Sequence, residues 1–172
     1  MLYRSKQGLN ALFAFRRQVD ESLVQDYLSE PEMALFKRLS RSEQLHSIAV
    51  LKTLLQNVPD ASPDLCKAAL LHDIGKSMKA LTVFQKTVNV LLRKFTPTLH
   101  RSLSATEAIR WWNAPMVVSR YHPKWGAELL VELNSSAQLV WLCEHHQDNP
   151  ANWQNHPYYG DLMALQMADN AN

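Results

Sequence analysis

Apolar residues recur at three- and four-residue intervals along most of the chain, and only four glycines interrupt the pattern. Such spacing places the apolar side chains on one face of an α-helix. The pattern therefore predicts an all-α protein, without internal repeats or low-complexity linkers. The predicted helices span about 9–29, from Glu30 onward, and about 41–56, 63–74, 81–96, 115–121, 123–133, 137–147 and 161–171.

Helix start and stop signals mark several of these boundaries. Ser62 is a typical cap residue, and Pro63 suits the first helical position, where its missing N–H does no harm. Asp64 then places an acid at the positive end of the helix dipole. Gly75 is expected to stop this helix. Pro97 is expected to end the next one, whose apolar face includes Phe84, Val88, Leu91 and Phe95.

The segment after Pro97 is expected to be less regular. Trp111 and Trp112 lie in it, and we expect them in the core rather than as platforms for base stacking. Further on, Pro123 is expected to open a helix separate from the short one over 115–121.

Length and composition fit one globular domain, with 172 residues of which 47% are hydrophobic. Residues 1–30 are expected to form a helical extension packed on or flanking a domain over 31–172, which carries a basic insert at about 77–121. No apolar run is long enough to span a bilayer or to serve as a secretory signal. Cys66 and Cys143 lie far apart without a Cys-x-x-Cys motif, so we expect free thiols and a cytoplasmic location.

The charge is distributed unevenly. Residues 76–124 carry nine Lys and Arg against one Glu, a net charge of +8, whereas the rest of the chain nets −6. A basic segment attracts anions such as phosphate substrates, nucleic acid or a membrane surface. A solvated basic face explains the same composition without any ligand.

Histidines and carboxylates fall on the apolar faces of four predicted helices. One histidine in such a place is more often a hydrogen-bonded core residue than a ligand, but the recurrence favours a metal site. The residues concerned are His46, His72 with the following Asp73, His146 and Asp169, together with His122 at the entrance of the helix opened by Pro123.

The carboxylates strengthen this interpretation. Burying Asp73 and Asp169 without a partner would be costly, and a cation among neutral imidazoles offsets that cost. Six or more nitrogen and oxygen donors without cysteine suit Fe, Mn, Zn, Co or Ni, and exceed the ligands of one structural zinc. We therefore expect two divalent transition-metal ions.

The order His, His-Asp, His, His-His, Asp resembles the HD-domain superfamily of metal-dependent phosphohydrolases, and the match runs from about Pro31 to the C-terminus. The resemblance implies an all-α helical bundle with its metal site in the helix core. The motifs that carry it are Leu70-Leu-His-Asp-Ile-Gly-Lys76, His122-Pro-Lys-Trp-Gly-Ala127, Glu144-His-His-Gln147 and Met167-Ala-Asp-Asn170.

The same resemblance implies a role for each of these residues. The ligands of a first metal would be His46, His72, Asp73 and Asp169, with Asp73 bridging to a second metal held by His122 and by His145, His146 or both. Neighbouring residues on a helix point about 100° apart. The apolar stripe favours His146 as the ligand, and His145 would then meet substrate or a carboxylate.

The function implied is hydrolysis of a phosphoester in a nucleotide or cyclic dinucleotide by a metal-activated hydroxide. Asp73 and Lys76 would be the catalytic residues, and Lys76, Arg120 and Lys124 would bind the charge of the substrate. The HD-GYP branch, which cleaves cyclic-di-GMP, is not expected, because residues 147–153 lack its Asp-Gly and Gly-Tyr-Pro sequences.

Two alternatives stay open. A mixed-valent di-iron oxygenase of the same superfamily uses this ligand set, and a non-catalytic signalling module could bind a nucleotide with it. Nucleic-acid binding is not expected, because the chain as a whole is only weakly basic and carries no recognisable module. The sequence leaves the oligomeric state open.

Overall fold

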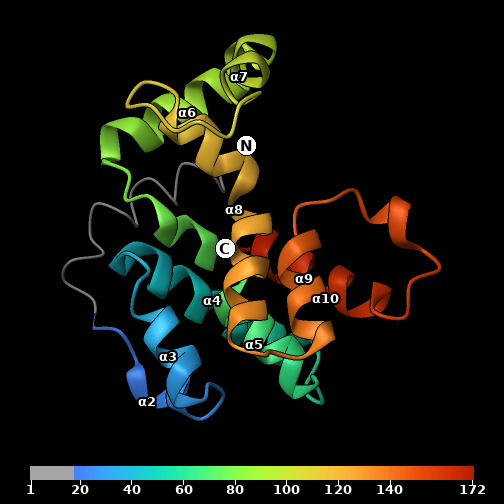
Figure 1. The fold of residues 1–172 in the computed structure, drawn as a ribbon. Helices are drawn as coiled ribbons and strands as arrows, with labels where there is room; N and C mark the ends of the chain where they lie inside the picture. The colour runs from blue at the N-terminus through green and yellow to red at the C-terminus, as the bar shows by residue number, and fades with distance from the viewer. Residues whose placement is uncertain (1–17) are drawn as a thin grey trace.

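The computed structural model describes residues 18–172, and it contains helices but no strand over that range (Figure 1). The all-α prediction is confirmed. None of the helices in the described range is long and apolar enough to cross a bilayer. In chain order the elements are α2 Glu21–Gln25, α3 Glu30–Phe36, α4 Arg41–Asn57, α5 Pro63–Leu71, η2 Ile74–Met78, α6 Val83–Phe95, α7 Pro97–Leu103, α8 Ala114–Glu132, α9 Ala137–His145, η3 Pro150–Trp153 and α10 Tyr159–Asn170, where η marks a 3-10 helix.

The hydrophobic core lies among α4, α5, α9 and α10. Fully buried leucines from all four helices meet there, each adding about 1.5–3 kcal/mol by leaving water. They include Leu51 and Leu54 of α4, Leu70 of α5, Leu142 of α9 and Leu162 of α10. This core fixes the four helices relative to one another.

The segment before α3 differs from its prediction. In place of a helix over 9–29, the described part contains only α2, which begins where Asp20 accepts a hydrogen bond from the backbone N–H of Leu23. Val24 and Leu28 are buried in the same core as the later helices, so this part of the extension packs on the bundle. The rest of the predicted helix, residues 9–17, lies outside the described residues.

Side-chain caps begin several helices at the predicted places. The Ser62 side chain accepts a hydrogen bond from the N–H of Leu65 at the start of α5, with Pro63 as its first residue. Ser136 does the same for α9, directly after a turn in which Asn134 has a positive φ. These caps satisfy backbone donors that the first helical turn leaves unpaired.

Helix α8 runs unbroken through Pro123, so the expected division into two helices is wrong. An internal proline costs about 3 kcal/mol through its missing N–H and its clash with the preceding turn. The face that includes His122, Pro123, Gly126 and Leu130 is buried against the molecule. This burial offsets the cost of the proline and keeps the helix continuous.

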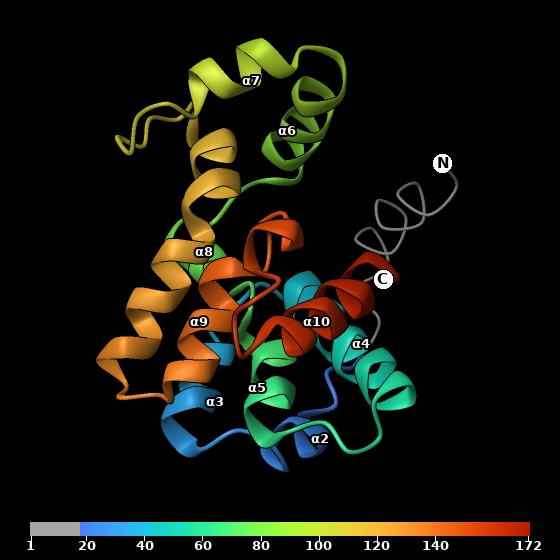
Figure 2. The ribbon, with the colours of Figure 1, turned by 90° about the vertical axis from the view of Figure 1, so that its right-hand side faces the viewer.

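Most of the basic insert, residues 82–112, forms a unit that we call the projecting unit. Helices α6 and α7 stand away from the core in both views, joined to the body through α8 (Figures 1 and 2). The stretch after Pro97, expected to be less regular, begins with α7, because Pro97 occupies the first turn of that helix, and residues 104–113 then form turns and irregular chain as expected. Trp111 and Trp112 are 72% and 53% exposed, which overturns their predicted place in the core, because the segment that carries them lies with the projecting unit.

Candidate metal centre

Six histidine and aspartate side chains gather where α4, α8, α10 and the ends of α5 and α9 meet. They form two groups of three, and within each group the ligand atoms lie within 4.8 Å of one another. The α4 group comprises His46, His72 and Asp169, and the α8 group comprises Asp73, His122 and His146. The structure thus brings together residues that are spread over more than a hundred positions of sequence.

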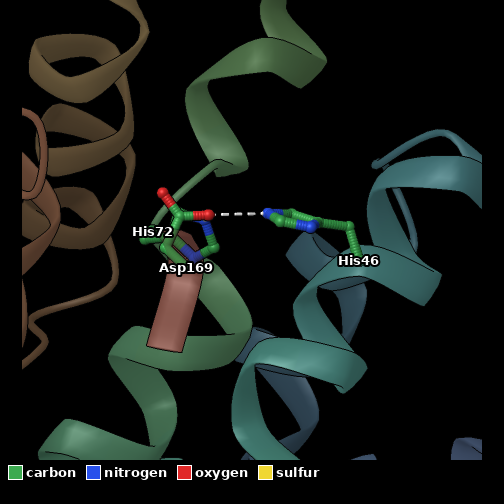
Figure 3. Close-up of side chains that lie close together, drawn as sticks. All are labelled: His46, His72 and Asp169. Carbon is green, nitrogen blue, oxygen red and sulfur yellow. Dashed lines mark hydrogen bonds and ion pairs between the residues drawn. The ribbon is translucent and has the colours of Figure 1, made fainter. Parts of the chain in front are cut away.

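The α4 group is arranged around the carboxylate of Asp169 (Figure 3). Its Oδ1 lies 2.8 Å from Nε2 of His46 and 3.7 Å from Nε2 of His72. His46 comes from the middle of α4, whereas His72 is the residue that caps the C-terminus of α5. Three donors from three helices therefore face a common point.

Asp73 lies between the two groups. Its Oδ1 is 3.1 Å from Nε2 of His122 and 3.7 Å from Nε2 of His146, both in the α8 group. Its Oδ2 is 3.5 Å from Nε2 of His72 in the α4 group. The two oxygens of one carboxylate thus serve two donor groups, an arrangement suited to bridging two cations.

Backbone hydrogen bonds fix the tautomers of three histidines in the centre. A carbonyl oxygen can only accept, so the ring nitrogen that contacts it carries the proton. The Nδ1–H groups donate over 3.1 Å from His72 to Ala69, 2.9 Å from His122 to Val118 and 2.7 Å from His146 to Cys143. In the neutral rings, each Nε2 is left with a lone pair that points into the centre.

These lone pairs fit a bound cation. The buried Nε2 of His72 has no hydrogen-bond partner among residues 18–172. The Nε2 atoms of His122 and His146 face each other at 3.3 Å, where two lone pairs repel unless a positive charge lies near both. Imidazole nitrogens and carboxylate oxygens are the ligands that divalent transition metals take in proteins, so the residues present fit such ions.

The protonation states of the centre favour the same conclusion. Burial raises the pKa of the Asp73 carboxyl, but the charge of the Lys76 ammonium outweighs this effect and holds the pKa well below its usual range. Burial lowers the pKa of both the His72 and the His146 imidazoles. Ionised carboxylates and neutral imidazoles are the forms that bind metal.

A close contact of η2 with α8 holds Asp73 beside His122. A Cβ atom at Gly75 would lie 2.0 Å from the carbonyl oxygen of His122 and 2.7 Å from the nitrogen of Gly126. The backbone of η2 therefore touches that of α8, and only glycine permits this approach. Gly75 is not the expected helix stop, because α5 already ends at Leu71 and the φ of Gly75 is not positive.

Lys76 lies at the edge of the centre, with its side chain 30% exposed and its Nζ paired with Oδ2 of Asp73. Burial lowers the pKa of the Lys76 ammonium, but the charge of Asp73 more than offsets this and raises the pKa. The side chain is therefore a cation at neutral pH, within reach of both the centre and solvent.

The other two residues expected to bind substrate charge lie elsewhere on α8. Arg120 is exposed and donates to the backbone oxygen of Ser104 at 3.4 Å, and Lys124 pairs with Glu107 at 3.2 Å. Each is two residues from His122, about 200° around the helix, so both lie on the side of α8 opposite the centre. The structure does not bring them to the two groups.

Of the adjacent histidines, His146 joins the α8 group and His145 joins neither group. Nδ1 of His145 lies 2.7 Å from Oδ2 of Asp148, and its ring packs on Trp141 and Trp153 with centroids 4.8 and 4.4 Å away. The stripe argument thus favoured the histidine that the structure places in the centre. Sequence analysis missed Asp148, although its spacing of three residues from His145 is one at which side chains meet on a helix.

The centre therefore consists of buried His and Asp groups that could hold metal ions. In His72, His122 and His146 the ring proton lies on Nδ1, where a backbone carbonyl accepts it. The Nε2 atom of each ring is therefore free to bind a metal ion. Comparisons of the chain with protein-family models, with curated proteins and with solved structures find no match.

Proposed function

We propose that the chain is a metal-dependent phosphohydrolase of the HD-domain type, with a divalent ion in each of the two groups. The observation that carries the proposal is the position of Asp73, whose two oxygens face Nε2 atoms of both groups. The sequence resemblance supports the same assignment, since its ligand pattern includes all six residues of the two groups.

His46, His72 and Asp169 would hold one ion, His122 and His146 the other, and Asp73 both. The donor set suits Fe, Mn, Zn, Co or Ni. A pair of such ions, when bound, lowers the pKa of water and neutralises charge on phosphoryl oxygens. The protein keeps the donors fixed, because the imidazole rings are held by backbone carbonyls and Asp73 is held by the contact of η2 with α8.

Lys76 would bind the substrate. Its ammonium is the cation next to Asp73, and its partial exposure leaves N–H donors free to turn toward an incoming phosphate. A phosphate oxygen would take the place that Oδ2 of Asp73 now has beside Nζ. Lys76 would thereby position the phosphoester at the edge of the buried centre and stabilise the charge that develops during hydrolysis.

The experiment that tests this function is a hydrolysis assay on metal-loaded protein with bis(4-nitrophenyl) phosphate and a panel of nucleotides and cyclic dinucleotides. We expect turnover by the wild type, and a loss of about 100-fold in kcat/KM for Lys76→Met, the size typical of removing one donor to the transition state. Lys79→Met, three residues further along and exposed, is the matched control and should keep full activity.

Three results would overturn the proposal. The first is the absence of hydrolysis of every substrate with every metal of the series. The second is oxygen consumption by iron-loaded protein with a polyol or phosphonate, which would assign an oxygenase. The third is tight nucleotide binding without turnover, which would assign a signalling module.

A further inference from the structure

The inward side of helix α6 is mixed in polarity, with Gln85 buried and Lys86, Val88, Asn89 and Leu92 partly buried. The one buried residue of α6 is Gln85, at 7% exposure, and the nearby polar residues Lys86 and Asn89 are hydrogen bonded to other elements. The contacts are Gln85 Nε2 to the backbone oxygen of Trp111 at 3.0 Å, Lys86 Nζ to Glu43 Oε1 at 2.9 Å, and Asn89 Oδ1 with His100 Nε2 at 2.9 Å. Of these contacts, the ion pair of Lys86 with Glu43 of α4 joins α6 to the body of the protein, and the other two lie within residues 82–112.

The apolar side of α6 faces solvent. Phe84, Leu91 and Phe95 lie on one face of the helix and are 67%, 49% and 68% exposed. We call these three residues the α6 apolar face. A soluble surface helix has the reverse arrangement, with its apolar stripe toward the core. The α6 apolar face is therefore built to contact something outside residues 18–172.

Other apolar residues of the projecting unit are also exposed. Leu99 of α7 is 48% exposed, and Trp111 and Trp112 are more than half exposed. Figure 2 shows α6 and α7 at the far end of the molecule from α2, with their outer sides uncovered by other helices. The exposed apolar residues thus belong to a part of the molecule that can approach a flat surface.

The charge of the projecting unit identifies the kind of surface. Arg93, Lys94, Arg101 and Arg110 lie on it, and its one acid, Glu107, is paired with Lys124. Exposed Phe, Leu and Trp beside Lys and Arg is the composition of helices that lie in the interface of an anionic membrane, where the rings enter the acyl boundary and the cations meet phosphates.

Other occupants fit less well. A second copy of the chain, in a symmetric contact, would bring two positively charged units together. Residues 1–17 carry four Lys and Arg and no acid, so they share the sign of the unit. Nucleic acid would pair with the cations but would leave the α6 apolar face without a role, because phosphate contacts dominate its affinity.

We propose that the projecting unit, residues 82–112, docks on the surface of an anionic lipid membrane through the α6 apolar face and the cations of the same unit. None of the six residues of the two donor groups lies in this range. The proposal therefore stands or falls separately from the metal centre.

The test is flotation of the full chain with vesicles of phosphatidylcholine that contain about one-third phosphatidylserine, beside vesicles of phosphatidylcholine alone. We expect binding to the anionic vesicles that weakens as salt is raised, and little binding to the neutral ones. The variant Phe84→Ser/Leu91→Ser/Phe95→Ser should have an affinity for the anionic vesicles at least about tenfold lower than that of the wild type. Val131→Ser, at a residue of α8 that is 59% exposed, is the matched control.

A charge variant tests the second half of the proposal without touching the apolar residues. Lys94→Glu, at a residue whose Nζ lies 5.0 Å from the ring centroid of Phe95, should also lower binding to anionic vesicles about tenfold, whereas Lys52→Glu on α4 should leave it unchanged. Circular dichroism establishes that each variant has the wild-type helix content.

Several outcomes would overturn the proposal. Folded wild-type protein that stays unbound in the presence of anionic vesicles would do so directly. Salt-sensitive binding to a DNA duplex without vesicle binding would assign the cations to nucleic acid. Self-association that the triple serine variant abolishes, again without vesicle binding, would assign the face to a second copy of the chain.

Discussion

The absence of a side chain at Gly75 lets η2 touch α8. In the variant Gly75→Ala, the new methyl group would meet backbone atoms of His122 and Gly126, which cannot turn aside. We expect the two segments to move apart, with a loss of roughly 1–3 kcal/mol in the free energy of unfolding and weaker metal binding as Asp73 leaves His122. Urea unfolding and a metal titration measure the two effects.

Gly160→Ala is the control for this prediction. No atom lies within 4 Å of a Cβ at this position, and Gly160 is part of α10. Alanine there should raise the free energy of unfolding by up to about 1 kcal/mol through its better helix propensity. If Gly75→Ala kept wild-type stability and metal affinity, the contact of η2 with α8 would not hold the centre together.

The adjacent histidines allow a comparison between two single variants. His146→Ala removes a donor of the α8 group and should weaken metal binding about 100-fold or more, as measured by calorimetric titration with Zn or Mn. His145→Ala leaves the donors in place and should change affinity by less than about tenfold. Equal losses in the two variants would contradict the assignment of His146 alone to the centre.

His46, His72, His146 and Asp169 could be predicted from the sequence because each interrupts an apolar stripe, which shows the buried side of a helix, whereas Asp73 and His122 were predicted from their motifs. The role of Gly75 could not, because its constraint comes from His122 and Gly126, far along the chain. The tautomers were also out of reach, since they depend on which carbonyl each ring meets in the folded protein.

At the scale of elements, Glu32 links the start of α3 to α5. Its carboxylate accepts hydrogen bonds from the backbone N–H and the hydroxyl of Ser29 at 2.8 and 2.7 Å, and from Nζ of Lys67 at 2.8 Å. Burial raises the pKa of this carboxyl, but the Lys67 and Ser29 donors outweigh it, so the pKa is lower in the folded protein than in the unfolded chain.

This shift predicts how stability depends on pH. Glu32→Gln should lower the free energy of unfolding by about 1–2 kcal/mol at pH 7. Because the pKa of Glu32 is lower in the folded protein, its ionisation stabilises the folded state at every pH above the unfolded pKa, near 4.5. This stabilisation is lost as the pH falls through the lower, folded pKa. The difference between wild type and variant should therefore narrow below about pH 4.5, as measured by urea unfolding at a series of pH values.

Glu30→Gln, in the same helical turn but exposed, is the matched control and should have little effect at any pH. A wild-type advantage over Glu32→Gln that stayed constant from pH 7 to pH 3 would show that ionisation of Glu32 contributes nothing.

Among the elements, the sequence predicted best the helices whose starts are set by a local cap, such as Ser62 and Ser136. It failed at Pro123, because burial of one face of α8 outweighs the local cost of proline. The stripe on α6 correctly predicted a helix. It could not show that Phe84 and Phe95 face solvent, because the side that a helix buries is decided by its neighbours.

At the scale of the whole molecule, the centre joins helices from both ends of the described chain. Ions that bind the folded state alone would stabilise it by about 2.7 kcal/mol per site at a concentration 100 times the Kd. We therefore expect the Tm to rise with Mn, Fe, Zn, Co or Ni and to fall again when a chelator is added. A Tm that no metal in this series changes would contradict a site formed on folding.

The arrangement of the whole molecule was the least predictable level. Helical periodicity identifies buried faces but not which faces meet, so the division of six ligands into an α4 group and an α8 group, with Asp73 between them, required the structure. The projecting unit was visible in the sequence only as a basic insert.

The measurement that tests the central claim most directly is the metal content per chain, by elemental analysis of protein purified without chelator. The two groups predict about two transition-metal ions per wild-type chain, with clear loss in Asp73→Ala and none in Asp60→Ala, an exposed carboxylate outside the centre. One ion or none in the wild type after reconstitution, or equal contents in wild type and Asp73→Ala, would contradict a centre bridged by Asp73.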